Sequence, residues 1–117
     1  MSKRVLLLED NKEIRELIED ILTGEGYQVI ALNHYESVVD IIDFAPNLIL
    51  LDIRLSNGYG HLLCQELKAD PETKQIPVIL VSAASNLEKI AKDSHADNFL
   101  SKPFDLQEFI DLVKKYI

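Results

Sequence analysis

The chain has 117 residues, 47% of them hydrophobic, which is the size and composition of one soluble domain with its own core. Its formal net charge of −8, without a cluster of lysine and arginine, argues against a surface for nucleic acid or anionic membrane. The single cysteine, Cys64, excludes an internal disulfide and fits a reducing compartment. The four aliphatic residues before Glu9 are too few for a signal sequence or membrane span, so we expect a cytoplasmic protein.

The first half of the chain begins with a predicted strand at 5–8, an aliphatic run that ends in Glu9 and Asp10. Apolar residues at helical spacing then predict an amphipathic helix from residue 12, capped by Asp10 or Asn11. Its expected apolar stripe is Ile14, Leu17, Ile18, Ile21 and Leu22. A second strand is predicted at 27–31. Val38, Val39, Ile41 and Ile42 mark a short helix that must end before Pro46.

The second half begins with a strand at 48–51, four aliphatic residues that lead into Asp52. A loop at 56–58 and a helix at about 58–69 follow, the helix with Leu62, Leu63 and Leu67 inward. Pro77 opens a fourth strand at 78–81, and a helix and a short fifth strand at 98–100 come next. The fourth helix carries Leu87, Ile90 and Ala91. The closing helix, capped by Asp105, carries Leu106, Phe109, Ile110, Val113 and Ile117.

Five strands that alternate with five helices predict an α/β fold with a parallel sheet covered on both faces. Right-handed crossovers then favour a doubly wound, flavodoxin-like (βα)5 three-layer sandwich with strand order 2-1-3-4-5. We expect one domain over 1–117, with no linker, repeat or output domain in this chain. Ligands of such folds bind at the carboxyl ends of the strands, near the switch between strands 1 and 3.

Polar groups follow four of the five predicted strands directly, and the strand at 27–31 contributes none. They are Glu9 and Asp10, Asp52, Ser82, and Lys102. Three close carboxylates repel one another by about 4 kcal/mol per pair at an effective dielectric of 20. The site therefore favours a hard divalent cation held by few carboxylates and several waters, as Mg²⁺ is. With an ammonium and a hydroxyl beside it, such a site can cradle a phosphoryl group that an aspartate attacks.

The sequence resembles, from Lys3 to Ile117, the receiver domain of bacterial two-component response regulators. Five motifs in the expected order carry the resemblance: Glu9-Asp10, Asp52 with Gly60 eight residues on, Pro77 before the fourth strand, Ser82-Ala83, and Lys102-Pro103-Phe104. The resemblance implies that Asp52 takes a phosphoryl group from a phosphohistidine of a sensor kinase or phosphotransferase, as a step of phosphorelay signalling. It implies a phosphoprotein module, and not an enzyme beyond Mg²⁺-dependent self-phosphorylation from small donors and self-dephosphorylation.

The resemblance also implies roles for individual residues. The implied Mg²⁺ ligands, with Mn²⁺ as a substitute ion, are Glu9, Asp10, Asp52 and the backbone carbonyl of Arg54. Ser82, Ala83 and Lys102 are expected to bind the phosphoryl group, and Phe99 is expected to turn inward with Ser82. The bond between Lys102 and Pro103 is expected to be cis.

The expected partners are proteins. Ile14, Pro103 and Phe104 are predicted to form an apolar docking ring for the kinase or phosphotransferase, although Ile14 fits a core position equally well. A downstream target is expected on the face of the fourth helix, the fifth strand and the closing helix. We expect a monomer or a weak phosphorylation-dependent dimer, with no direct binding of nucleic acid or membrane. Met1 directly ahead of the first strand favours a stand-alone receiver over a piece of a longer regulator.

Four positions depart from the family pattern. Glu9 replaces the more usual aspartate, and Phe99 lacks the hydroxyl of a frequent tyrosine. Ser56 stands where proline is frequent, which predicts a less rigid loop after Asp52. His95 stands where glycine is frequent, at a helix end that needs a positive φ.

Three alternatives use the same fold differently. A phosphatase of the haloacid dehalogenase type needs Asp-x-Asp, but Arg54 stands two residues after Asp52 and the chain leaves no room for a cap domain. A flavodoxin-like cofactor binder needs a phosphate loop after the first strand, where the acids Glu9 and Asp10 would repel a phosphate. A pseudo-receiver that acts only as a docking module remains the third, disfavoured by the complete set of acid, hydroxyl and lysine.

Overall fold

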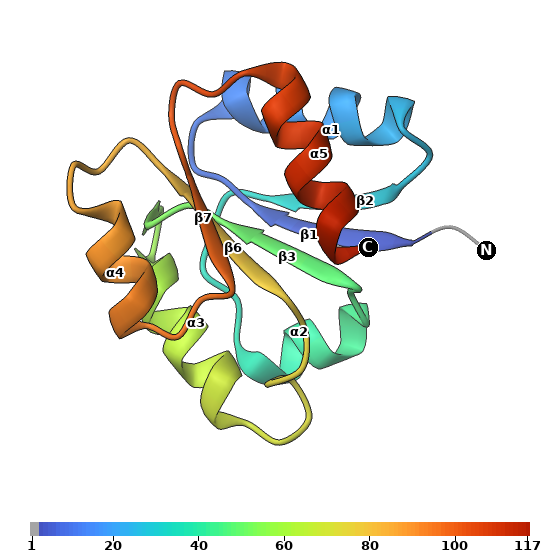
Figure 1. The fold of residues 1–117 in the computed structure, drawn as a ribbon. Helices are drawn as coiled ribbons and strands as arrows, with labels where there is room; N and C mark the ends of the chain where they lie inside the picture. The colour runs from blue at the N-terminus through green and yellow to red at the C-terminus, as the bar shows by residue number, and fades with distance from the viewer. Residues whose placement is uncertain (1–2) are drawn as a thin grey trace.

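A five-stranded parallel sheet forms the centre of the molecule in the computed structural model, which describes residues 3–117 (Figure 1). The strands are β1 (Arg4–Leu8), β2 (Gln28–Leu32), β3 (Leu48–Leu51), β6 (Val78–Ser82) and β7 (Asn98–Ser101). They lie in the order β2-β1-β3-β6-β7, so the predicted order 2-1-3-4-5 is confirmed. Met1, used above to favour a stand-alone receiver, lies outside the described residues.

Helices cover both faces of the sheet (Figure 1). On one face lie α1 (Lys12–Gly24) and α5 (Leu106–Tyr116), and on the other lie α2 (Val38–Phe44), α3 (Gly60–Ala69) and α4 (Leu87–Asp93). Alternate strand residues feed the two cores: Val5 and Leu7 pack with α1 and α5, whereas Leu6 and Leu8 pack toward α2, α3 and α4. A strand buried on both faces needs aliphatic residues at every position, which is why these strands appear as unbroken runs. None of the helices within residues 3–117 is long and apolar enough to span a membrane.

The helix ends follow from local chemistry. The Asn11 side chain accepts a hydrogen bond from the Ile14 amide at 3.0 Å, and Asp105 caps α5 in the same way through the Gln107 amide. His95 has a φ of 64°, as expected at the end of α4. Ala45 also adopts a positive φ, of 50°, which was not predicted. The proline that follows it disfavours the right-handed helical conformation, so α2 ends at this residue.

Several apolar residues assigned to the inward stripes are instead exposed. Leu17 on α1 is 55% exposed, Leu62 on α3 is 44% and Leu106 on α5 is 53% exposed, and Val39 on α2 is exposed as well. The sheet can cover only part of a helix surface, and on α1 it fully buries Ile18 and Leu22 alone. The apolar stripes are therefore wider than the core requires, and the excess lies on the surface.

The segment predicted as a loop at 56–58 is a small β-hairpin. Strands β4 (Arg54–Leu55) and β5 (Gly58–Tyr59) pair antiparallel, with Arg54 opposite Tyr59 and Leu55 opposite Gly58. Ser56 and Asn57 form the two-residue turn between them, and α3 begins at residue 60, not at 58. Strands of two residues are too short to show an alternating pattern, so they could not be predicted from the sequence.

Candidate functional site

The carboxyl ends of the strands bring the predicted polar residues to one edge of the sheet. Leu8 of β1 pairs with Leu51 of β3, so Glu9 and Asp52 follow neighbouring strands at the same level. The Asp52 amide donates to the Leu8 carbonyl at 2.8 Å and extends this pairing by one residue. Beside Asp52 opens a cleft of about 290 Å³. Its lining residues are Asp52, Ile53, Arg54, Ser82, Ala83, Ala84 and Lys102.

The Lys102 ammonium forms ion pairs with two carboxylates in this site. The Lys102 Nζ atom lies 2.7 Å from Glu9 Oε1 and 3.3 Å from Asp52 Oδ2. The three side chains are nearly buried, with exposed fractions of 13% for Lys102, 1% for Glu9 and 14% for Asp52. With both carboxylates ionised, the group carries one excess negative charge in a poorly solvated place, which favours binding of a proton or a cation.

This environment shifts the pKa of the Glu9 carboxyl group. Burial raises the pKa of its carboxyl group from 4.5 to about 7, with a further rise from neighbouring Asp52 and an opposing effect from Lys102. The Asn11 amide donates to Glu9 Oε2 at 3.2 Å, so the carboxyl group is fixed at the start of α1. Near neutral pH, Glu9 can therefore exchange a proton for a cation.

Ser82 and Lys102 are joined through the backbone. The Lys102 amide donates to the Ser82 carbonyl at 2.9 Å, directly beyond the pairing of Ser82 with Ser101. The Ser82 hydroxyl accepts from the Ala84 amide at 3.2 Å. The peptide bond between Lys102 and Pro103 is cis. Hydroxyl and ammonium are thus delivered to the same cleft by adjacent strands.

A steric constraint explains why glycine occupies position 60, eight residues after Asp52. A Cβ atom at Gly60 would lie 1.8 Å from the Asp52 carbonyl oxygen, far inside any tolerable contact. The Gly60 amide also donates to the Ile53 carbonyl at 2.7 Å. Helix α3 therefore begins directly against the backbone of Asp52, and only glycine permits this approach.

The oxygen atoms at the carboxyl edge of the sheet are of the type that binds hard cations, although only two carboxylates lie close together there. Glu9, Asp52 and the backbone after Asp52 offer oxygen atoms, which Mg²⁺ prefers. Asp10 is exposed, and no three His, Cys, Asp or Glu side chains within residues 3–117 form a ready metal cluster. Lys102 lies between the two carboxylates, so a cation would compete with its ammonium. The oxygen donors of Glu9 and Asp52 and the excess negative charge fit Mg²⁺, whereas exposed Asp10 stays a predicted ligand.

The other predicted residues lie outside the cleft in two separate places. Ile14, Pro103 and Phe104 do meet, around a smaller cavity of about 170 Å³ next to Lys102, and exposed Leu17 joins them. Phe99 is half-buried and lines a third cavity, of about 390 Å³, between α4 and α5. The structure thus places the expected docking residues together and places Phe99 on the face of α4, β7 and α5.

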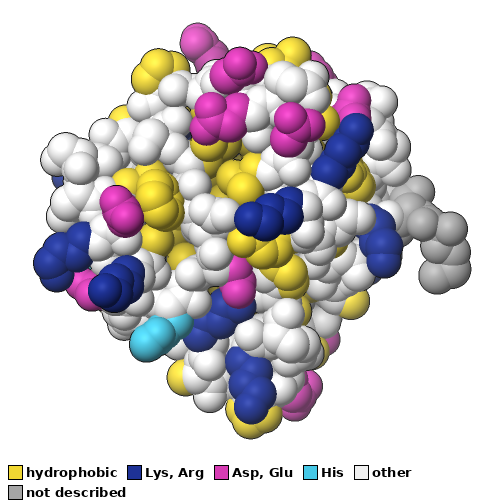
Figure 2. Space-filling model, viewed as in Figure 1, with side chains coloured by type: hydrophobic (Ala, Val, Ile, Leu, Met, Phe, Trp, Pro, Cys, Tyr) yellow, Lys and Arg dark blue, Asp and Glu magenta, His cyan; other side chains and the backbone are white. Residues whose placement is uncertain are grey.

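Acidic side chains gather at one edge of the visible surface. Figure 2 shows several of them along the upper edge, over α1 and the start of α5, whereas basic side chains are spread over the rest of this face, some of them beside α4. The exposed acids of α1 and of the start of α5 include Glu13, Glu16, Asp105 and Glu108. The apolar residues next to the cleft are therefore bordered by negative charge.

Some residues of the site were missed by sequence reasoning. The Arg15 guanidinium donates to the Glu9 carbonyl at 2.9 Å and to the Asp10 carbonyl at 3.4 Å, which steadies the backbone of the acid pair. Arg15 lies on the polar side of α1, so from the sequence it could not be distinguished from an ordinary surface charge. Leu17 was assigned to the core, and its signal was the surplus of apolar residues in that helix.

Comparison with known proteins agrees with this geometry. Residues 5–114 match the family model of the response regulator receiver domain. The chain is 32% identical over 120 residues to the polar-differentiation response regulator DivK of Brucella anthropi, covering 100% of this chain and 98% of DivK. It is also 32% identical over 117 residues to the phosphate regulon transcriptional regulatory protein PhoB of Escherichia coli, covering 97% of this chain and 51% of PhoB. It thus spans about half the length of PhoB.

Solved structures show the same fold. A response regulator from Chloroflexus aurantiacus superposes with a TM-score of 0.91 at 26% identity, over 99% of this chain and 98% of that one. The receiver domain of a sensor histidine kinase from Pseudomonas aeruginosa superposes with a TM-score of 0.83 at 23% identity, over 99% and 98% of the two chains. That protein was crystallised with a magnesium ion in its active-site cleft. These matches do not favour the phosphatase or the docking-only alternative.

Proposed function

The chain belongs to the receiver-domain family of two-component response regulators, and from this we propose that it is switched by phosphorylation of Asp52. The observation that supports Asp52 most directly is its carboxylate at the mouth of the cleft, 3.3 Å from the Lys102 ammonium. Ser82 and Ala83 line the same cleft. A nucleophile, a cation and a hydroxyl therefore meet where an acyl phosphate would form.

The proposed step is a transfer of one phosphoryl group. An Asp52 carboxylate oxygen forms a bond to phosphorus while the bond from phosphorus to a histidine nitrogen of the donor breaks. The nitrogen keeps the electron pair, and the imidazole takes up a proton from water. Lys102 neutralises charge on the phosphoryl oxygens and Ser82 donates a hydrogen bond to one of them.

A divalent cation completes this proposal. The residues that would hold Mg²⁺, or Mn²⁺ in its place, are Glu9, Asp10, Asp52 and the Arg54 carbonyl. Bound there, the ion would supply positive charge for the transferred phosphoryl oxygens. Besides the transfer from a donor histidine, the only reactions that we assign to the chain are self-phosphorylation from small donors and self-dephosphorylation.

The partners follow from the two surfaces beside the site. A sensor histidine kinase or histidine phosphotransferase in the cytoplasm would dock on Ile14, Leu17, Pro103 and Phe104, bordered by the acids of α1 and α5. A downstream protein, or a second copy after phosphorylation, would bind the face of α4, β7 and α5, where Phe99 lies. Movement of Ser82 toward the phosphoryl group would draw Phe99 inward and so change that face.

Incubation with acetyl phosphate and Mg²⁺ tests the acceptor. We expect the intact mass to rise by one phosphate, and EDTA to prevent the rise. Asp52→Asn should abolish it, because an amide is not a nucleophile here, while the exposed Asp43→Asn on α2 should leave it unchanged. Absence of any mass increase in the wild-type protein would contradict the proposal.

The docking surface has a test of its own. Ile14→Ala should slow transfer from the histidine kinase that phosphorylates the wild type fastest, by about tenfold if the side chain is an interface hot spot. Labelling by acetyl phosphate should stay unchanged, since a small donor needs no docking. Equal slowing with both donors would show that Ile14 serves only the core.

A further inference from the structure

The segment after β2, at residues 33–37, lies against the turn of the β4–β5 hairpin. The Asn57 side chain makes a two-way contact with the backbone of Tyr35: its Oδ1 atom accepts from the Tyr35 amide, and its Nδ2 atom donates to the Tyr35 carbonyl at 3.4 Å. The Ser56 amide donates to the Asn33 carbonyl at 3.3 Å. Three hydrogen bonds thus join two loops that are 22 residues apart at Tyr35 and Asn57.

The Tyr35 ring adds an apolar contact to these hydrogen bonds between residues 33–37 and the hairpin. It covers Gly58 so closely that a Cβ atom there would lie 2.8 Å from Tyr35 Cδ2. The ring is half-buried and packs against the core beneath α2, α3 and α4. Burial, with the Glu66 carboxylate of α3 beside the hydroxyl, raises the pKa of Tyr35 to about 12. Tyr35 is therefore held by the core, and it holds the hairpin in turn.

The opposite end of the same hairpin is fixed to the reactive aspartate. The Ile53 amide donates to Asp52 Oδ1 at 2.7 Å, and the Gly60 amide donates to the Ile53 carbonyl at 2.7 Å. Arg54 pairs with Tyr59 between these two anchors. The chain from Asp52 to Gly60 is thus pinned at its base by α3 and at its turn by Tyr35 and Asn57.

We propose that Tyr35 and Asn57 are positioning residues that fix the Arg54 backbone carbonyl for the divalent cation at Asp52. This inference rests on the proposed function, and it gives the segment after β2 a part in the site although it supplies no reactive group. A carbonyl that is already in place spares the cation the entropy of ordering a loop. The same contacts would oppose the loss of rigidity that Ser56 predicts for this loop.

Magnesium titration of the metal-free protein tests the proposal, and since the chain has no tryptophan we choose isothermal titration calorimetry. Asn57→Ala removes both side-chain hydrogen bonds to Tyr35 and should raise the Mg²⁺ dissociation constant about fivefold, a factor on the order of one net hydrogen bond. With acetyl phosphate, this variant should need more Mg²⁺ for half-maximal labelling and yet reach the wild-type rate at saturation. Backbone amides of residues 54–58 should exchange hydrogen faster than in the wild type, before any metal is added.

Asn47→Ala is the matched control. Its Oδ1 atom also accepts a backbone amide from a distant segment, that of Arg4 at 2.8 Å, but at the opposite end of the sheet. It should lose similar stability without any change in Mg²⁺ affinity. Gly58→Ala provides a second route to the same effect, because the added methyl group must displace the Tyr35 ring.

The outcomes separate this inference from the proposed function. If wild-type protein binds Mg²⁺ and both Asn57→Ala and Gly58→Ala bind it equally well, the positioning role is refuted and the phosphoacceptor role stands. If Asn47→Ala weakens Mg²⁺ binding as much as Asn57→Ala, the effect is general loosening and the positioning role is again refuted. If the wild type neither binds Mg²⁺ nor accepts phosphate, both fail together.

Discussion

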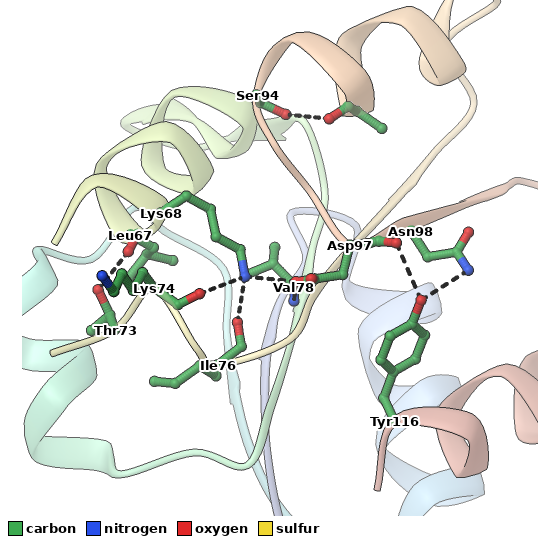
Figure 3. A network of polar contacts seen from close by, with 11 residues as sticks. Leu67, Lys68, Thr73, Lys74, Ile76, Val78, Ser94, Asp97, Asn98 and Tyr116 are labelled. Atoms are coloured by element: carbon green, nitrogen blue, oxygen red, sulfur yellow. Dashed lines mark hydrogen bonds and ion pairs between the residues drawn. The ribbon is translucent and has the colours of Figure 1, made fainter. Parts of the chain in front are cut away.

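Lys68 and Lys102 are both nearly buried, at opposite ends of the sheet, but they differ in their acceptors, their net charge and the space beside them. The Lys68 Nζ atom has three acceptors: the Lys74 carbonyl at 3.1 Å, the Ile76 carbonyl at 2.8 Å and Asp97 Oδ2 at 2.6 Å (Figure 3). Lys102 has two carboxylates and a cleft beside them. The Lys68 group is neutral, and all three protons of its ammonium have acceptors. The Lys102 group has excess negative charge and room for a ligand.

The Lys68 group links several elements at the amino end of the sheet (Figure 3). Asp97 Oδ2 also accepts the Val78 amide at 2.8 Å, and the Asp97 carbonyl accepts the Tyr116 hydroxyl at 3.2 Å. Helix α3, the start of β6, the start of β7 and the end of α5 are thereby joined. A buried ammonium whose three protons are all bonded fixes structure, and one that shares two carboxylates at a cleft can exchange partners.

The largest expected effect concerns Lys102→Met. Phosphorylation by acetyl phosphate should slow about a hundredfold, the usual loss on removal of one preorganised charge from a transition state. Mg²⁺ should bind more tightly than in the wild type, because the competing ammonium is gone. Lys68→Met should change neither the labelling rate nor the Mg²⁺ affinity by more than about twofold, which stopped-flow labelling and calorimetry can check. Equal losses in the two variants would remove the distinction.

The free energy of unfolding should depend on Lys68. Lys68→Met should lower the free energy of unfolding by about 2 kcal/mol, less than for a fully buried pair because Asp97 is 37% exposed. Urea denaturation measures this. Lys74→Met is the matched control: only its backbone carbonyl takes part, so the change should stay below about 0.5 kcal/mol. Identical denaturation curves for the two variants would refute the structural role of Lys68.

The pH dependence of stability should reveal the raised pKa that burial gives to Glu9. Its pKa is about 7 in the folded protein and 4.5 in the unfolded chain, so folding favours the protonated form. Its contribution is therefore complete below pH 4.5 and is lost as the pH rises through 7, by at most about 3 kcal/mol. In EDTA, the unfolding free energy of Glu9→Gln relative to the wild type should rise over this range. A difference that does not change with pH would contradict the raised pKa.

The smallest effect is expected for Tyr116→Phe. The Tyr116 hydroxyl donates to the Asp97 carbonyl at 3.2 Å and accepts from Asn98 Nδ2 at 3.2 Å. Its loss should lower the free energy of unfolding by about 1 kcal/mol and leave phosphorylation unchanged. Hydrogen exchange of the β7 amides should rise only slightly. A loss as large as that of Lys68→Met would mean that the hydroxyl, and not the lysine, holds this end together.

The fold and the main site residues could be predicted because each depends on a short-range pattern. Unbroken aliphatic runs identify strands buried on both faces, and parallel strands bring the residues after them to one edge. Asp52, Ser82 and Lys102 were found in this way, and the structure places them around one cleft. The same reasoning placed Ile14 beside Pro103 and Phe104.

The remaining features depend on long-range contacts that produce no periodic pattern in the sequence. Lys68 and Asp97 are 29 residues apart, and Tyr35 and Asn57 meet through loops of irregular conformation. The exposure of Leu17 depends on how much of α1 the sheet can cover, which the stripe itself does not reveal. Such features are set by tertiary packing, which overrides local preference.

The identity of the phosphorylated residue decides whether Asp52 is the phosphoacceptor. Acyl phosphates are reduced by borohydride to alcohols, so a phosphorylated aspartate becomes homoserine and can be located by peptide mass spectrometry. After treatment with acetyl phosphate and Mg²⁺, then borohydride, we predict homoserine at position 52 and at no other aspartate. Homoserine at a different position, or an unaltered Asp52 in protein that has gained a phosphate, would contradict the account.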